Sequence, residues 1–194
     1  YEAVVNSYLS GLEDIVEGGG DPSNVFSVAS FFIARVDTAV DEILRSSKGT
    51  EQYLNKSAIS NAKVAYRKFK EYFNTSRFAV LEAKGAMKQK PLWASTATKD
   101  PALNDTYYFD ELIAESTVIT MPETLLSAVL DHATTDKVIP PESSDSLYQI
   151  SEIKNCGVDI EAVADGLLKA GLQGFSKSYE ELIATIGVKR KSIN

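Results

Sequence analysis

Apolar side chains along the first part of the chain alternate between helical and strand-like spacing. Helical spacing covers residues 4–16 and ends at three consecutive glycines, which stop a helix. The nearly continuous apolar stretch "VFSVASFFIARV", residues 25–36, predicts a strand that is buried on both faces. Helical patterns then cover residues 36–44 and 59–73. The order helix, strand, helix, helix is therefore expected before residue 75.

Two shorter apolar stretches predict further strands. The segment "LWA", residues 92–94, leads into a polar stretch that ends in Asp100-Pro101, a turn signal. The segment "TVITM", residues 117–121, precedes a helix that should open at Pro122, with Thr120 placed to cap it. Strands separated by helices favour a parallel sheet with crossover helices, so the predicted fold class is α/β.

The last third of the chain has a different pattern. Residues 134–145, "TTDKVIPPESSD", are rich in proline and serine and predict a linker. Helical patterns follow over residues 147–156, 159–170 and 175–186, and each is followed by a glycine expected to end it: Gly157, Gly171 and Gly187. This pattern divides the chain into residues 1–135 and a C-terminal helical segment, residues 136–194, that packs on the first part.

Composition narrows the class of protein. With 194 residues and 44% hydrophobic side chains, the chain can bury one sizeable core. The net charge of −7 argues against a nucleic-acid-binding protein, and the basic residues between 63 and 90 fit the solvated face of a helix. The single cysteine, Cys156, excludes an internal disulfide and suits a reducing compartment. No apolar run approaches the ~20 residues of a membrane span, so we expect no membrane partner.

Five segments resemble those of transaldolases, in the same order. They are "VASFFIARVDTAVD", "AISNAKVAYRKFKEYF", "KPLWASTATKDP", "NDTYYFDEL" and "TMPETLL". The resemblance covers almost the whole chain and is greatest for the subfamily found in plants and many bacteria. It implies a (β/α)₈ TIM barrel that transfers a dihydroxyacetone unit between sugar phosphates through a lysine Schiff base. It also implies no metal or other cofactor, and a cytoplasmic or plastid location.

The resemblance covers only the C-terminal part of that barrel, about three strands. In the family, the segment that matches Tyr1 follows the fifth strand, and the Schiff-base lysine lies upstream on the fourth. Chemistry agrees, because such a lysine needs a desolvated position within a buried strand, and no lysine here has that setting. We therefore expect this chain alone to be inactive. We also expect its strand edges to be covered by the missing N-terminal barrel half or by another chain.

Four residues are expected to hold substrate. By resemblance, Ser30 faces the barrel interior near the Schiff-base carbon, and Arg35, near the end of the same strand, binds the substrate phosphate. Ser95 adds a hydroxyl to that phosphate, and Lys99 is a further basic member. Arginine and hydroxyl donors at strand ends suit a phosphate dianion. The alternatives are a salt bridge from Arg35 to Asp37 or to an acidic residue of a helix, and, for Ser30, a small core residue whose hydroxyl is hydrogen-bonded within the core.

Three functions remain open at this point. The chain is the C-terminal portion of a transaldolase, a naturally truncated binding or structural subunit, or a half-barrel that shares its site with a separate chain. A first residue other than methionine is typical of a processed or truncated chain, which favours the first interpretation.

Overall fold

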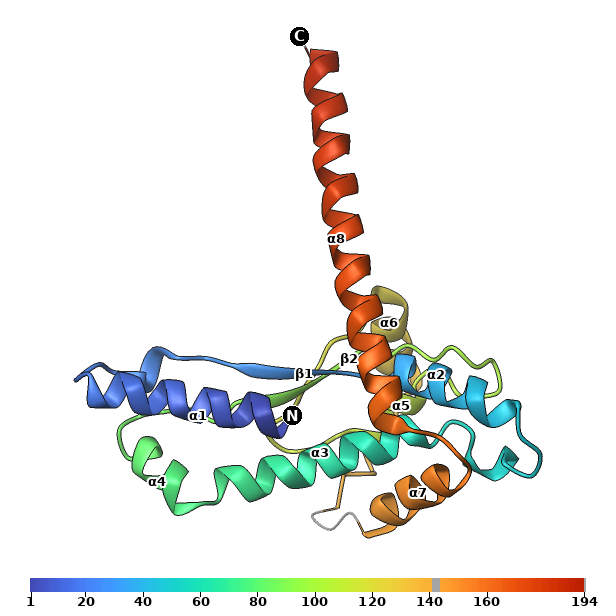
Figure 1. Cartoon of the computed structure of the whole chain (residues 1–194), viewed down its shortest axis with the longest axis horizontal. Helices are drawn as coiled ribbons and strands as arrows, with labels where there is room; N and C mark the ends of the chain where they lie inside the picture. Colours follow the sequence, from blue (N-terminus) through green and yellow to red (C-terminus); the bar gives the residue numbers. More distant parts are fainter. Residues whose placement is uncertain (141–143, 194) are drawn as a thin grey trace.

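A small parallel sheet lies at the centre of the computed structural model, which describes residues 1–140 and 144–193 (Figure 1). Its strands are β1 (Val28–Phe32), β2 (Lys90–Ala94) and β3 (Val118–Ile119), arranged in the order β1-β2-β3. Both pairs of neighbours are parallel, and Val28 of β1 is aligned with Lys90 of β2. Helices connect the strands, which confirms the predicted α/β class.

Helices make up most of the described chain. In order they are α1 (Glu2–Glu17), α2 (Ala34–Arg45), α3 (Ser57–Phe73), α4 (Ser76–Glu82), α5 (Tyr107–Glu111), α6 (Glu123–His132), α7 (Ser144–Asn155) and α8 (Ile160–Ile193), with short 3-10 turns η1 (Pro22–Asn24) and η2 (Glu51–Tyr53). The crossover from β1 to β2 contains α2, α3 and α4, and the crossover from β2 to β3 contains α5. Parallel strands require such long connections, because a tight turn can join only antiparallel ones.

The main core lies between the sheet and helices α1, α3 and α4. Trp93 of β2 is fully buried there, and its ring centroid is 5.4 Å from that of Phe31 on β1. The Trp93 indole N–H donates to the carbonyl of Leu112 at 3.1 Å, so its one polar atom is satisfied. A second apolar cluster, containing Val40 and Ile153, joins α2 to α7.

The first strand is shorter than predicted and is open on one face. The apolar stretch 25–36 was expected to be one strand, but β1 ends at Phe32 and α2 begins at Ala34. Ala29 is buried, whereas Val28 is 46% exposed and Ser30 is also exposed. The prediction of burial on both faces was therefore wrong.

The third strand and the helix after it also differ from the prediction. The segment 117–121 contributes only two residues to the sheet, in β3. Helix α6 does begin after Pro122, as expected, but no side chain caps it. The Thr120 hydroxyl instead donates to the carbonyl of Trp93 at 3.3 Å, which fastens the end of β3 to β2.

The C-terminal segment forms two helices where three were expected. Helix α7 ends at Asn155, and Gly157 follows with a φ of 89°, a left-handed conformation that glycine adopts without strain. Gly171 and Gly187, expected to end further helices, lie inside the single 34-residue helix α8. Residues 134–140 of the predicted linker contain neither helix nor strand, and residues 141–143 of that linker lie outside the described chain.

A buried carboxylate fastens α2 to the start of α3. Asp37, 2% exposed, accepts hydrogen bonds from the Ser57 hydroxyl at 2.7 Å, the Ala58 amide at 2.7 Å and the Tyr108 hydroxyl at 2.9 Å. Ser57 and Ala58 are the first residues of α3, whose own N-cap residue, Lys56, makes no side-chain cap. Asp37 therefore caps α3 from a neighbouring helix, where a negative charge also complements the helix dipole.

Replacing Asp37 with alanine should destabilise the chain by about 3 kcal/mol. The substitution leaves the Ala58 amide and the Tyr108 hydroxyl buried without their acceptor, and such groups are costly. Urea unfolding followed by circular dichroism measures the change. The matched control is Asp14→Ala on the exposed surface of α1, which should change stability by less than about 0.5 kcal/mol. Equal effects of the two substitutions would contradict the capping role.

Candidate functional site

The carboxyl ends of β1 and β2 are held together beyond the strands themselves. The Ile33 amide donates to the carbonyl of Ala94 at 2.9 Å, and the Ala34 amide donates to the carbonyl of Ser95 at 2.9 Å. Ser95 has a φ of 58°, a left-handed conformation that is uncommon outside glycine. The first residues of α2 and the residues after β2 therefore share one hydrogen-bonded edge. Functional groups of parallel α/β folds gather at this end of the strands.

Arg35 lies in the first turn of α2 and not in the strand, where it was expected. Its exposed guanidinium is 4.5 Å from the centroid of the Phe32 ring, a cation–π contact. The alternative of a salt bridge to Asp37 is not observed, because Asp37 is bound to α3 and Tyr108. Among the residues that the structure describes, Arg35 has no carboxylate partner. Its charge is thus directed to solvent beside the strand end.

Ser30 lines a cavity of about 600 Å³ next to the free side of β1. Phe32 lines the same cavity, as do Lys68 of α3 and Leu168 of α8. A Cβ placed on Gly171 would lie 3.9 Å from the Phe32 ring, so α8 passes close to this aromatic side chain. Ser30 is exposed at this cavity, unlike the small core residue of the alternative interpretation.

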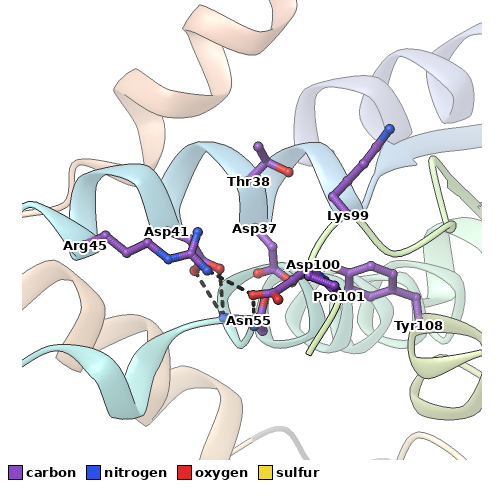
Figure 2. A pocket seen from close by; sticks show the side chains of 9 residues that line it. All are labelled: Asp37, Thr38, Asp41, Arg45, Asn55, Lys99, Asp100, Pro101 and Tyr108. Carbon is purple, nitrogen blue, oxygen red and sulfur yellow. Dashed lines mark hydrogen bonds and ion pairs between the residues drawn. The ribbon is translucent and has the colours of Figure 1, made fainter. Parts of the chain in front are cut away.

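Lys99 belongs to a different cavity. It lines a space of about 180 Å³ between α2 and the loop after β2, together with Asp37, Asp41 and Asp100 (Figure 2). Figure 2 shows the Lys99 side chain directed away from these carboxylates. Asp100 is held by the Arg45 guanidinium at 2.9 Å, so the loop that carries Lys99 is tied to α2.

The carboxylates of this smaller cavity already accept hydrogen bonds from other residues of the chain. Both oxygens of Asp41 accept from the Asn55 amide at 3.1 Å, where Asn55 has a φ of 60°. Burial, together with the charges of Asp37 and Asp100, raises the pKa of Asp41 to about 6, against the opposing effects of the Asn55 amide and Arg45. Burial also raises the pKa of Asp37, against its hydrogen bonds to Ala58, Ser57 and Tyr108. Hydrogen bonds from Asn55 and Ala102 lower the pKa of Asp100.

The predicted phosphate ligands Lys99 and Arg35 differ in their electrostatic surroundings. Three carboxylates next to Lys99 offset its positive potential, so an anion gains little there. Arg35 has no such neighbour, and it follows Ala34, whose amide is hydrogen-bonded to the Ser95 carbonyl at the joined strand ends. Within residues 1–140 and 144–193, no group of three or more histidine, cysteine, aspartate or glutamate residues could hold a metal ion.

The four predicted residues thus fall into two groups. Arg35 and Ser95 lie on segments whose backbones are hydrogen-bonded to each other, and Ser30 lies on β1 two residues before Phe32, the ring beneath Arg35. Lys99 lies in the separate acidic cavity. Three residues of this region were not predicted: Phe32 and the buried carboxylates Asp37 and Asp41, of which Asp37 caps α3 and Asp41 binds the Asn55 amide. The only available signal for Asp37 and Asp41 was their four-residue spacing, which places both on one face of a helix.

Comparison with known proteins identifies the family. The sequence profile described as "Transaldolase/Fructose-6-phosphate aldolase" matches residues 2–186. The chain belongs to this transaldolase family. It is similar to the transaldolases of Saccharopolyspora erythraea (42% identity), Acidothermus cellulolyticus (44%) and Frankia alni (44%), in each case over 96% of this chain. The match covers 51%, 50% and 51% of those relatives, so this transaldolase-family chain spans about half their length.

The described helices of this transaldolase-family chain include no candidate membrane-spanning segment. The relatives named above are bacterial, and membership of the subfamily shared with plants stays a prediction. The roles of Ser30, Arg35, Ser95 and Lys99 also stay predictions.

Asp41 should make stability depend on pH between about 4 and 7. Its pKa of about 6 in the fold exceeds the value near 3.9 of an unfolded aspartate. The folded chain therefore binds the proton more tightly, so this group destabilises the fold above pH 6, and that destabilisation disappears as the pH falls to about 4.

Asp41→Asn should remove this contribution. Urea unfolding of both proteins across this pH range measures it: relative to the parent, the variant should be progressively more stable as the pH rises. Asp14→Asn, at an exposed position, serves as the control. Parallel stability curves for Asp41→Asn and the parent would contradict the assignment.

Proposed function

We propose that residues 1–194 supply the substrate phosphate-binding half of a transaldolase. The reaction moves a dihydroxyacetone unit from sedoheptulose 7-phosphate to glyceraldehyde 3-phosphate, giving erythrose 4-phosphate and fructose 6-phosphate. A lysine outside this chain forms the Schiff base. Family membership and the half-length match to transaldolases support this proposal. Residues 1–135 are the second half of a (β/α)₈ barrel, and residues 136–194 are a helical segment packed on it.

One observation supports the phosphate site more than any other. The hydrogen bond from the Ala34 amide to the Ser95 carbonyl joins segments that lie 61 residues apart, and Arg35 is the next residue after Ala34. Phe32 supports the guanidinium from below without neutralising it. A phosphate that bridges Arg35 and Ser95 would receive charge-assisted hydrogen bonds from both. Ser30, two residues before Phe32 on β1, lines the larger cavity, where the sugar would lie.

The exposure and the pKa values of the lysines support a Schiff-base nucleophile outside this chain. All of them lie in the described residues, and none is buried. The pKa of Lys68 is raised by Glu71 and Glu2, and that of Lys137 is raised by Glu111. A Schiff-base lysine needs the opposite shift, because only the neutral amine attacks a carbonyl. No specific observation favours the alternative of a non-catalytic subunit.

Arg35→Ala should weaken sugar-phosphate binding more than Lys99→Ala. Arg35 has no competing carboxylate, whereas Lys99 stands beside three of them. We expect roughly a tenfold increase in the Kd for fructose 6-phosphate with Arg35→Ala, about 1.4 kcal/mol, and less than a threefold increase with Lys99→Ala. Isothermal titration calorimetry of the whole chain measures both. A larger effect of Lys99→Ala would place the phosphate in the acidic cavity and contradict the proposal.

Borohydride reduction in the presence of fructose 6-phosphate tests the catalytic half of the proposal. Incubated alone, the chain should give no reduced adduct on any lysine in peptide mass mapping. Incubated with the half of the Saccharopolyspora erythraea transaldolase that it does not match, it should permit an adduct on a lysine of that half. An adduct on a lysine of residues 1–194 would make this chain an enzyme by itself and overturn the proposal.

A further inference from the structure

Asn55 lies where three segments of the chain meet. Its backbone amide donates to both carboxylate oxygens of Asp41 on α2 at 3.1 Å. Its side-chain amide donates to Asp100, in the loop after β2, at 3.0 Å, and Figure 2 shows both contacts. Its carbonyl accepts from the Tyr107 hydroxyl of α5 at 3.1 Å. A single half-buried residue therefore connects α2, the loop after β2 and α5.

The backbone at Asn55 has a conformation that glycine adopts most readily. Its φ is 60°, in the left-handed region, and asparagine is one of the few other residues that tolerate this region. Glycine would supply the two backbone contacts equally well. The contact to Asp100 needs the asparagine side chain. The feature that distinguishes asparagine from glycine at this position is therefore its hold on the loop after β2.

Both carboxylate oxygens of Asp100 are hydrogen-bonded. One oxygen accepts from the Asn55 side chain at 3.0 Å and from the Arg45 guanidinium at 2.9 Å, and the other accepts from the Ala102 amide at 2.9 Å. The Arg45 side chain is 54% exposed, and an ion pair in contact with water contributes little. The half-buried Asn55 therefore holds Asp100 more effectively than Arg45 does.

This contact is the second attachment between the loop and α2. The first is the hydrogen bond from the Ala34 amide to the Ser95 carbonyl, at the start of the loop. Asp100 follows Ser95 by five residues, and Asn55 is itself bound to α2. Ser95 has a φ of 58°, and a residue in this conformation persists where the surrounding contacts fix it. The two attachments together restrain the segment that begins at Ser95 relative to the helix that carries Arg35.

We propose that Asn55 is a positioning residue for the phosphate site. Through Asp100 it holds the loop against α2, in the arrangement in which Ser95 and Arg35 can bind one phosphate. The inference rests on the proposed function. Asn55 and Asp100 act through the loop and do not bind the phosphate themselves. They restrict the loop before the ligand arrives, so less ordering has to accompany binding.

A purely electrostatic role of Asp100 predicts the opposite effect on binding. A carboxylate near an anion site repels the phosphate, so its removal would by charge alone strengthen binding. Loss of the hold on the loop weakens binding instead. The direction of the change in affinity therefore distinguishes the two roles.

Titration calorimetry of the whole chain with fructose 6-phosphate tests the inference. Asn55→Gly keeps the left-handed backbone and removes the contact to Asp100 without changing the charge. Asn55→Gly and Asp100→Ala should each raise the Kd roughly fivefold. Asp105→Ala is the matched control, because it removes one carboxylate from the far end of the same loop, where Asp105 binds His132. Its Kd should change less than twofold. Should Asp100→Ala fail to fold, Asn55→Gly decides the question by itself.

Amide hydrogen exchange followed by NMR tests the hold on the loop without any ligand. The Ala34 amide is bonded to Ser95, and the Leu103 amide is bonded within the loop. Release of the loop opens both bonds more often, so both amides should exchange at least about threefold faster in Asn55→Gly. The amide of Phe69, buried within α3, should exchange at the same rate as in the parent.

The two measurements together decide the inference. Faster exchange of the loop amides combined with weaker binding, in Asn55→Gly but not in Asp105→Ala, supports it. Unchanged exchange overturns it, and so does faster exchange with an unchanged Kd. Tighter binding by Asp100→Ala also overturns it, because the charge of Asp100 would then outweigh its hold on the loop. A parent chain that binds no fructose 6-phosphate contradicts the proposed function, whereas faster exchange in Asn55→Gly would still support the hold of Asn55 on the loop.

Discussion

The parallel pairing of β1 with β2 is the constraint on which the other features depend. It requires a long crossover, which α2, α3 and α4 supply, and its hydrogen bonds continue past the strands into Ile33 and Ala34. The amides at a helix start normally need a side-chain cap, and α2 has none. The carbonyls of Ala94 and Ser95 take that place. The same two bonds that start α2 therefore also set Arg35 against the end of β2.

The spacing of apolar residues predicted which helices and strands form better than it predicted where each one begins and ends. Residues 25–36 are apolar almost throughout, and a buried strand and the buried start of a helix look alike in such a stretch. The change from β1 to α2 depends on the two carbonyls of the neighbouring strand, which sequence pattern does not reveal. The helices at residues 4–16 and 59–73 were predicted closely, because each has a long apolar face at 3.6-residue spacing.

The remaining differences come from contacts between distant parts of the chain. Asp37 meets Tyr108 across 71 residues, so its capping role was not visible beside Arg35 in the sequence. Gly171 was expected to end a helix, but leucines and alanines on both sides favour continuation, and nothing in the described chain packs against the next turn to bend it. A glycine ends a helix only where other contacts make use of the left-handed conformation.

Trp93 provides an intrinsic fluorescence probe of the sheet. It is the only tryptophan of the chain, and its side chain is fully buried. Its indole N–H donates to the Leu112 carbonyl, which links the middle strand to the segment before β3. Its fluorescence emission reports the polarity of that one place. Loosening of the sheet shifts the emission to longer wavelength. Movement of the projecting part of α8, which contributes no residue to the core cluster around the indole, leaves the emission unchanged. A single spectrum therefore separates opening of the sheet from rearrangement of the projecting helix.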